Sequence, residues 1–245
     1  MSDRATRSRS FETVAAEYER HRPEYPEEAL RWAADQLGLE AGARVLDIGA
    51  GTGKLTRGLV ALGFDVVAVE PGAPMLAQLR EAVPEAEGHE APAESIPLPD
   101  GNVDAAFAGQ AFHWFDPERA LPELHRVIRP GGGLGLLWNW WDERDPLQAE
   151  LGVLIGYAGH QPYRDDELPG LPWFREVGRT VVESAEESTP DALVGQLATT
   201  SAFLTAEPEE REDVLRSVHD MACRYGKRFP LPRFTYAFVF ARADA

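Results

Sequence analysis

The sequence predicts an α/β fold, in which a seven-stranded, mostly parallel sheet carries helices on both faces. A small helical cap is expected from the N-terminal segment and the C-terminal half. Short apolar runs alternate with helical patterns between residues 43 and 139, which is typical of repeated strand–helix–strand units. The run "RFTYAFVFARA" near the C-terminus follows largely helical sequence. A late strand of this kind predicts an antiparallel strand that closes the sheet.

The elements of the first half follow from apolar periodicity. Apolar runs too short for helices predict strands at residues 43–48, 65–71, within 87–95, 103–110 and 133–139. Apolar residues at helical spacing predict helices at residues 27–37, 52–62, 74–83 and 117–127. We expect Gly38 to cap the first of these helices at its C-terminus. We expect the Thr52 hydroxyl to cap the N-terminus of the second.

The second half is less regular. Residues 140–160 are aromatic and then helical, 177–184 predict a strand, and 189–226 are largely helical. We therefore expect a flexible tail followed by one domain, 11–245. The tail is residues 1–10. The domain begins with N-terminal helices at 11–40 and a ligand-binding core at 41–140. A cap with insertions on the substrate side follows at 141–230, and a final strand at 231–245.

Composition excludes several classes of partner. The chain has 245 residues, a 44% hydrophobic composition and a net charge of −17. Such acidity disfavours nucleic acid and anionic membranes, which are bound through clustered Lys and Arg. No run approaches a membrane span, and the first ten residues lack the apolar stretch of a signal peptide. The lone Cys223 cannot form an internal disulfide. We expect a cytoplasmic protein, monomeric or homodimeric, and a structural role for Cys223.

The stretch "VLDIGAGTGKLT", residues 45–56, is a strand that ends in a glycine-rich turn. Nucleoside triphosphates, dinucleotides and sulfonium nucleosides bind on such turns. A P-loop is rejected, because Leu55 stands where the metal-binding hydroxyl is needed and Ile48 where the first glycine is needed. The spacing also departs from the G-x-G-x-x-G dinucleotide fingerprint. Asp47 would repel a pyrophosphate but not a cation, and Glu70, at the end of the next strand, suits two ribose hydroxyls.

Several ordered segments resemble one enzyme family. "VLDIGAGTGKLT" resembles motif I of class I S-adenosylmethionine (SAM)-dependent methyltransferases, and "VVAVEP" resembles the acidic motif that follows it. "APAESIPLPDGNVDAAFAGQAFHWFDPERALPELHRVIRPGG" and "AAEYERHRPEYP" are similar to the subfamily that includes trans-aconitate methyltransferases. The resemblance covers residues 11–140 well and the C-terminal half loosely. It implies a Rossmann-like fold, SAM as cofactor and a small-molecule acceptor.

The resemblance and the residues together nominate a cofactor site. Its predicted members are Tyr18, Arg22, Asp47, Gly49, Ala50, Gly51, Gly53, Glu70, Met75, Ala93, Glu94, Gln110 and Trp114. The glycines let the backbone approach the methionine part of the cofactor. The resemblance places Glu94 at the adenine amino group, between apolar walls from Met75 and Ala93. It also implies that Arg22, with Tyr18 or Tyr25, closes over the methionine carboxylate.

The residues that act on the acceptor are less defined. Gln110 and Trp114 follow the fourth strand, where the ligand crevice of an open sheet lies, and Gln110 is expected near the sulfonium. His113 is the candidate general base for a hydroxyl, phenol or amine acceptor, although it could equally only pack. A carboxylate acceptor would need no base. No metal is expected.

Two further features of the second half stay open. The aromatic and acidic residues 138–145 form either a rigid core corner or an acceptor wall. An anionic acceptor would need an arginine, and the candidates are Arg144, Arg164 and Arg175.

The sequence therefore predicts a SAM-dependent methyltransferase that acts on a small organic acceptor, most simply on a carboxylate or hydroxyl oxygen. One alternative is a protein of the same fold that binds SAM without transferring its methyl group. A nicotinamide-dependent oxidoreductase is the other, and the glycine spacing and Asp47 disfavour it. A strand–helix turn that binds no ligand is a third reading of the glycines alone.

Overall fold

The computed structural model describes residues 14–156 and 171–243. The predicted tail, residues 1–10, and the candidate Arg164 lie outside these residues. The chain divides into two compact units. The sheet unit comprises residues 23–139 with the described parts of 170–182 and 235–245, and the helical unit comprises the described parts of 1–22, 140–169 and 183–234.

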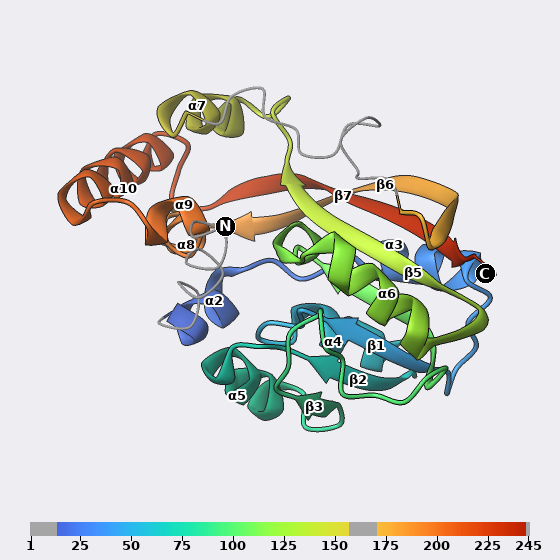
Figure 1. Cartoon of the computed structure of the whole chain (residues 1–245). Helices are drawn as coiled ribbons and strands as arrows, with labels where there is room; N and C mark the ends of the chain where they lie inside the picture. The colour runs from blue at the N-terminus through green and yellow to red at the C-terminus, as the bar shows by residue number, and fades with distance from the viewer. Residues whose placement is uncertain (1–13, 157–170, 244–245) are drawn as a thin grey trace. The chain divides into compact units, whose positions relative to one another are not determined.

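The sheet has seven strands in the order β3-β2-β1-β4-β5-β7-β6, which confirms the predicted fold class. Its strands are β1 (Arg44–Ile48), β2 (Asp65–Val69), β3 (Glu87–His89), β4 (Val103–Gly109), β5 (Ile128–Trp141), β6 (Phe174–Ser188) and β7 (Phe229–Arg242). The first five strands pair in parallel. In Figure 1 the arrow of β7 runs opposite to that of β5, as the alternating C-terminal sequence predicts. The chain passes between the two units along β5, β6 and β7.

Parallel pairing brings the important strand ends together. Ile48 of β1 is in register with Val69 of β2, and Asp47 with Phe107 of β4. Both β1 and β2 are buried from their second residue onward, as expected of strands covered on two faces. The turns that follow β1, β2 and β4 therefore meet at one edge of the sheet.

The strand predicted at residues 133–139 begins earlier, at Ile128, so residues 130–132 lie inside β5. Val103 pairs with Ile128, whereas Ala105 pairs with Gly133, so the intervening residues of β5 bulge out of the ladder. Pro130 has no amide hydrogen to donate, and Gly131 has a φ of 80°. These two residues break the pairing locally without ending the strand.

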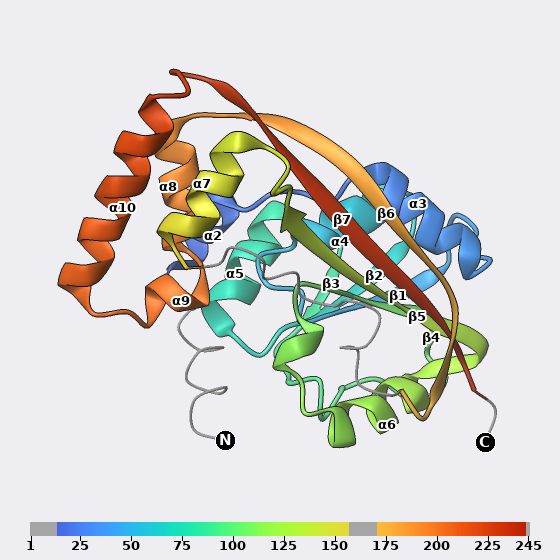
Figure 2. The ribbon, with the colours of Figure 1, turned by 90° about the horizontal axis from the view of Figure 1, so that it is seen from above.

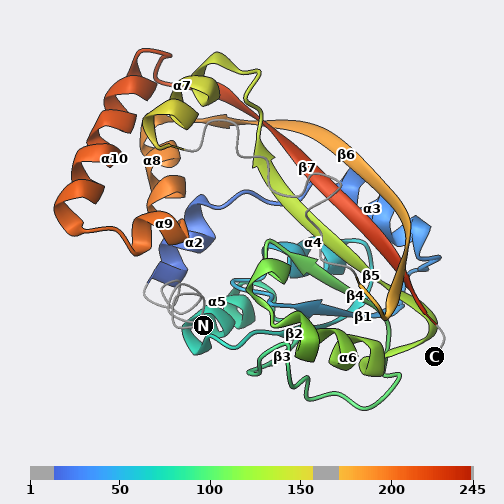
Figure 3. The ribbon, with the colours of Figure 1, turned by 45° about the horizontal axis from the view of Figure 1, so that its top comes forward.

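Helices cover both faces of the sheet unit. They are α3 (Glu27–Gln36), α4 (Lys54–Ala61), α5 (Ala73–Ala82), the short 3-10 helix η2 (Phe112–Trp114) and α6 (Pro117–Val127). Figures 2 and 3 show α3 and α6 on opposite sides of the sheet. Leu30 of α3 and Leu59 of α4 share a core with Phe107 and Leu137 of the strands. Each of these four side chains is almost fully buried.

Thr52 does not cap α4, contrary to expectation. The N-cap is Gly53, whose φ of 93° lies in the left-handed region, and no side chain bonds to the free N–H groups there. The predicted helix therefore begins two residues later, because the left-handed glycine keeps the chain out of the helix until Lys54. The Thr52 hydroxyl is buried and has no hydrogen-bond partner among the described residues.

The helical unit has its own apolar core. Its helices are α2 (Ala15–His21), α7 (Pro146–Leu154), α8 (Pro190–Ala198), α9 (Ser201–Leu204) and α10 (Pro208–Cys223). Leu151 of α7, Leu197 of α8 and Val218 of α10 belong to one buried cluster with Leu231 of β7. Figure 2 shows α7, α8 and α10 side by side. Across residues 14–156 and 171–243, no helix combines the length and apolarity that a membrane crossing requires.

Candidate functional site

The glycine turn connects β1 to α4 in a conformation that needs glycine. Gly49, Gly51 and Gly53 have φ values of 69°, 58° and 93°, in the left-handed region that other residues rarely adopt. The amide of Gly49 donates to the Val69 carbonyl oxygen at 2.8 Å, and that of Gly53 donates to the Ala50 carbonyl oxygen at 3.0 Å. These bonds fold the turn tightly against the end of β2.

The three glycines have different surroundings. A Cβ atom added at Gly49 would lie 2.6 Å from that of Ala111, and one at Gly53 would lie 3.1 Å from Leu79 Cγ. At Gly51, by contrast, an added Cβ would meet no atom within 4 Å. Close packing therefore explains Gly49 and Gly53. Gly51 instead leaves open space beside the backbone, as a ligand that approaches the turn requires.

Glu70 joins the ends of β1 and β2. Its Oε2 accepts a hydrogen bond from the Gly51 amide at 2.9 Å, and its Oε1 accepts one from the Gly72 amide at 2.8 Å. The predicted ribose-binding carboxylate thus lies beside the open face of the turn. Both oxygens accept from backbone amides, and a carboxylate oxygen can accept more than one hydrogen bond.

Asp47 is buried under the turn, with 1% of its surface exposed. Its Oδ2 accepts from the Thr56 hydroxyl at 2.6 Å, and its Oδ1 has no hydrogen-bond partner among the described residues. Burial raises the pKa of Asp47 to about 7; the bonds from Thr56 oppose this rise and the charge of Glu70 adds to it. A nearby cation would stabilise the ionised form.

Gln110 and Asn139 lie at the ends of β4 and β5. Gln110 is the non-glycine residue with a positive φ, 53°, in the described part of the chain. Such strain is a reason to suspect function. Its Nε2 donates to the Asn139 carbonyl oxygen at 2.6 Å. Asn139 in turn donates to the Glu24 carbonyl oxygen and accepts from the Thr235 hydroxyl.

Asn139 was not predicted from the sequence, although the rule that pointed to Gln110 applies to it equally. Asn139 lies where β5 reaches the same edge of the sheet as the end of β4. Its buried amide links β5, β7 and the segment before α3. An asparagine at the end of an otherwise apolar run was the available signal.

The N-terminal segment enters the sheet unit at Pro23 and contacts the sheet through Tyr25. A Cβ atom added at Gly109 would lie 2.5 Å from the Tyr25 hydroxyl oxygen, so this hydroxyl lies over the carboxyl end of β4. Lys54 Nζ bonds to Glu24 Oε1 at 2.9 Å and ties the same segment to α4. Tyr18 and Arg22 belong to the helical unit. Their role at the methionine carboxylate stays a prediction.

The remaining predicted residues lie in α5, in the loop after β3 and in η2. Met75 and Ala93 are both 5% exposed, and their role as apolar walls for adenine stays a prediction. Glu94 Oε1 accepts from the Asp116 amide at 2.7 Å and anchors the start of α6. His113 and Trp114 lie in η2, with ring centroids 4.7 Å apart. The position of His113 suits packing as well as proton transfer, and its role stays a prediction.

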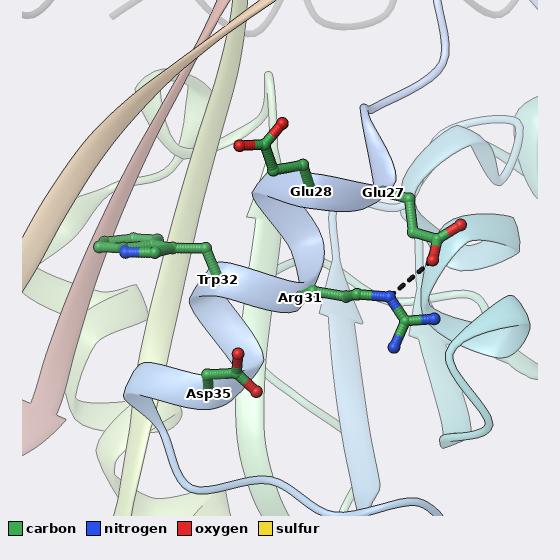
Figure 4. A pocket seen from close by; sticks show the side chains of 5 residues that line it. All are labelled: Glu27, Glu28, Arg31, Trp32 and Asp35. Carbon is green, nitrogen blue, oxygen red and sulfur yellow. Dashed lines mark hydrogen bonds and ion pairs between the residues drawn. The ribbon is translucent and has the colours of Figure 1, made fainter.

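A shallow hollow lies elsewhere, on the exposed side of α3. It is lined by Glu27, Glu28, Arg31, Trp32 and Asp35, and Glu27 accepts from Arg31 at 2.6 Å (Figure 4). Each polar side chain there is exposed. None of the predicted site residues lines this hollow, so it has no part in the site described above.

The chain is similar to known methyltransferases. Residues 46–136 match the methyltransferase domain family. An uncharacterized methyltransferase of Mycobacterium tuberculosis is 46% identical over 214 residues, which are 87% of this chain and 86% of that protein. An uncharacterized methyltransferase of Schizosaccharomyces pombe is 32% identical over 83% of both chains.

A solved structure from Anaeromyxobacter dehalogenans, described as that of a proposed type II methyltransferase, is also similar. It has a TM-score of 0.68 and 31% identity, over 90% of this chain and 97% of that one. Together with the glycine turn, the acidic residues that end β1 and β2, and the sheet order, these similarities exclude the nicotinamide alternative. The chain belongs to the SAM-dependent methyltransferases.

Proposed function

We propose that this methyltransferase acts on an oxygen atom of a small organic acid, with the glycine turn and Glu70 holding the cofactor. The observation that carries the cofactor site is the open space beside Gly51, bordered by the Glu70 carboxylate. Gly38 has similar open space beside it, so the hydrogen bond from the Gly51 amide to the Glu70 carboxylate is what distinguishes this turn. The buried oxygen of Asp47 that lacks a partner supports the same location.

Each residue of the site has a proposed task. Glu70 accepts hydrogen bonds from the ribose hydroxyls, and Gly51 lets the backbone come close to the methionine part. Asp47 supplies negative charge beneath an ammonium group. Gln110 presents its carbonyl oxygen toward the sulfonium, because its amide nitrogen is already bound to Asn139. Met75, Ala93 and Glu94 line the adenine.

The chemistry demands little of the protein. When bound, SAM supplies a methyl group that its sulfonium charge has already activated. An acceptor oxygen forms the new bond to carbon as the carbon–sulfur bond breaks, and the products are a methyl ester and S-adenosylhomocysteine. The chain's residues orient the acceptor oxygen in line with that bond and exclude water. A carboxylate needs no base, so His113 is then a binding residue.

Two observations favour an acid as acceptor. Over 209 residues the chain is 29% identical to the malonyl-[acyl-carrier protein] O-methyltransferase of Pseudescherichia vulneris, which covers 72% of this chain and 83% of that protein. The N-terminal segment and core also resemble the trans-aconitate methyltransferase subfamily. Both names describe enzymes of acidic acceptors. The net charge of −17 further disfavours nucleic acid as the acceptor.

The proposal is tested with a panel of small carboxylic acids, phenols and amines, each incubated with the enzyme and SAM. The expected products are S-adenosylhomocysteine and, by mass spectrometry, an acid that is heavier by one methylene group. Hydroxylamine should cleave that product, because it attacks esters but not ethers or methylamines. Methylation of phenols or amines alone, with every acid inert, would contradict an acid as acceptor.

A further inference from the structure

Two arginines of the helical unit, Arg22 and Arg233, have one carboxylate partner among the described residues, and that carboxylate, Glu186, pairs with Arg233. Arg22 follows α2 as its C-cap residue, and Arg233 lies on β7 with 6% of its surface exposed. Leu231, two residues before Arg233, is in the core cluster with Leu197 of α8. Because side chains alternate along a strand, Arg233 faces the same side of β7 as Leu231, which is the side of α8.

The packing of α2 on α8 brings Arg22 to the end of α8. A Cβ atom added at Gly195 of α8 would lie 2.6 Å from the ring of His21, so the two helices are in close contact. Arg22 donates from Nε to the Thr199 hydroxyl at 3.1 Å and from Nη2 to the Thr199 carbonyl oxygen at 2.9 Å. Its guanidinium carbon lies 4.9 Å from the centre of the Tyr18 ring. Within the described residues Arg22 makes no ion pair.

Arg233 has one acidic partner, Glu186, in the described part of the chain. The Glu186 side chain is 50% exposed, so solvent weakens its attraction. Burial lowers the pKa of Arg233, the charge of Glu186 raises it, and the charge of Arg22 lowers it. The two guanidinium groups therefore repel one another across a partly desolvated region. Such an arrangement is costly unless an anion completes it.

Arg144 of this unit is fully paired. Arg144 bonds to both Asp142 and Glu183 and stacks on Phe234, with 4.6 Å between the guanidinium carbon and the ring centre. It is therefore occupied, although the sequence nominated it to bind the acceptor. Arg175 is exposed and lies in the sheet unit. The chain has 41 acidic and 24 basic residues, so acidic partners are plentiful. Two arginines with a single carboxylate partner between them are therefore unusual in this chain.

We propose that Arg22 and Arg233 form a carboxylate-binding site and that a carboxylate of the methyl acceptor occupies it. This inference rests on the proposed function, because it takes the acceptor to be a small acid. Guanidinium groups bind carboxylates through two parallel hydrogen bonds, and the Thr199 hydroxyl lies beside Arg22. The acceptor then carries two acidic groups, and this site holds one of them. Arg22 thus serves the acceptor, whereas the sequence resemblance assigns it to the cofactor.

The test measures binding without catalysis. The full chain is saturated with S-adenosylhomocysteine and titrated by calorimetry with linear dicarboxylates from malonate to adipate and with monocarboxylates of equal length. We expect a dicarboxylate to bind at least about tenfold more tightly than its matched monocarboxylate. Arg22→Gln and Arg233→Gln should each remove that advantage. Arg233→Lys, which keeps the charge but loses the planar fork, should retain part of it.

Arg228→Gln is the matched control. Arg228 pairs with Glu187 much as Arg233 pairs with Glu186, but its side chain is 71% exposed, so dicarboxylate affinity should stay within about twofold. Arg22→Gln changes a half-buried residue and keeps the test valid if Arg233→Gln fails to fold. The affinity for S-adenosylhomocysteine, measured alone, should be unchanged in every variant.

Three results would overturn the inference. In the first, the wild type shows no preference for dicarboxylates. In the second, the preference survives both arginine changes. In the third, the arginine changes weaken S-adenosylhomocysteine binding instead of acid binding. The last result would return Arg22 to the methionine carboxylate. Failure of methyl transfer to acids, with arginine-dependent dicarboxylate binding intact, would refute the proposed function and leave this site standing.

Discussion

The two units of the molecule differ in how their functional residues are assembled. In the sheet unit, Asp47, the glycine turn and Glu70 lie within one strand–turn–helix–strand segment, and parallel pairing aligns the ends of β1 and β2. In the helical unit, Arg22, Thr199 and Arg233 come from three distant parts of the sequence. Their proximity depends on the packing of α2 on α8 and on the path of β7.

This difference teaches what to expect of each unit. The turn in the sheet unit is specified by local backbone chemistry, because only glycine tolerates its dihedral angles. The arginine pair in the helical unit depends on long-range packing and is visible only after folding. We expect changes in the sheet unit to affect the cofactor and changes in the helical unit to affect the acceptor. The predictions below test that separation.

The largest effect is expected at Gly51. Valine there should abolish cofactor binding, because its side chain fills the open space beside the turn. The left-handed backbone should also cost about 1–2 kcal/mol of stability. Gly38→Val is the matched control, because Gly38 has a similar φ of 62° and also has no atom within 4 Å of an added Cβ. Both variants should lose similar stability, measured by denaturant unfolding.

Only Gly51→Val should lose calorimetric binding of S-adenosylhomocysteine. Equal cofactor affinity in the two glycine variants would show that the turn is a packing device. The cofactor would then not be bound by the glycine turn of the sheet unit.

The second effect concerns Asp47 and pH. Its pKa rises from 3.8 to about 7 on folding, so the folded chain keeps a proton that the unfolded chain releases. The associated stability is complete below pH 4 and is lost as pH rises through 7; about three pKa units correspond to roughly 4 kcal/mol. Asp47→Asn cannot ionise and should remove this part of the pH dependence of the free energy of unfolding.

Asp65→Asn serves as the control, since Asp65 begins β2 and its side chain is 52% exposed. Its pH profile should match the wild type between pH 4 and 8. Saturation with SAM should also flatten the wild-type profile, because the cofactor's ammonium group would stabilise the ionised Asp47. A profile for Asp47→Asn that superimposes on the wild type would show that Asp47 is ionised in the folded chain throughout this range.

The third effect is at Glu70. Alanine there removes a charged acceptor from the Gly51 and Gly72 amides and from the cofactor ribose. Each such bond is worth about 1.5–3 kcal/mol, so affinity for S-adenosylhomocysteine should fall at least about tenfold. Glu123→Ala is the control, because Glu123 also accepts from a backbone amide, that of Ile96 at 2.9 Å. It should lose stability without losing cofactor affinity.

Dicarboxylate affinity sharpens the Glu70 result. Glu70→Ala should leave it unchanged, whereas Arg233→Gln should reduce it and spare the cofactor. A loss of both affinities in either variant would mean that the two units do not divide the ligands between them.

The fold was largely predictable, and the reason is physical. Apolar runs buried on both faces identify parallel strands regardless of context, so β1, β2 and β4 were found close to their observed bounds. The bulge in β5 was not found, because whether Pro130 and Gly131 end a strand or interrupt it depends on the partner β4. The length of β6 was underestimated, since exposed polar residues cover most of it.

The candidate site divides in the same way. Gly51 and Glu70 could be named from the sequence because the turn's conformation and the strand ends are local properties. Thr52 was misjudged as a cap, since the sequence does not reveal that Gly53 adopts a left-handed conformation. Arg233 was not nominated, because an arginine in an alternating strand looks exposed until α8 is packed on it. Asn139 was missed, although its place at the end of a strand was visible.

The smallest effect is expected at His113, and it separates the two oxygen chemistries. With an acid as acceptor the oxygen is already ionised above about pH 5, so His113→Ala should alter acceptor KM and leave kcat independent of pH from 6 to 8. His125→Ala is the control. His125 lies in the last turn of α6, and its ring bonds to the Ala243 carbonyl oxygen. With a hydroxyl acceptor, His113→Ala should instead reduce kcat by about a hundredfold or more. A pH-dependent step near 6–7 in the wild type that vanishes in this variant would make His113 the base and a hydroxyl the acceptor.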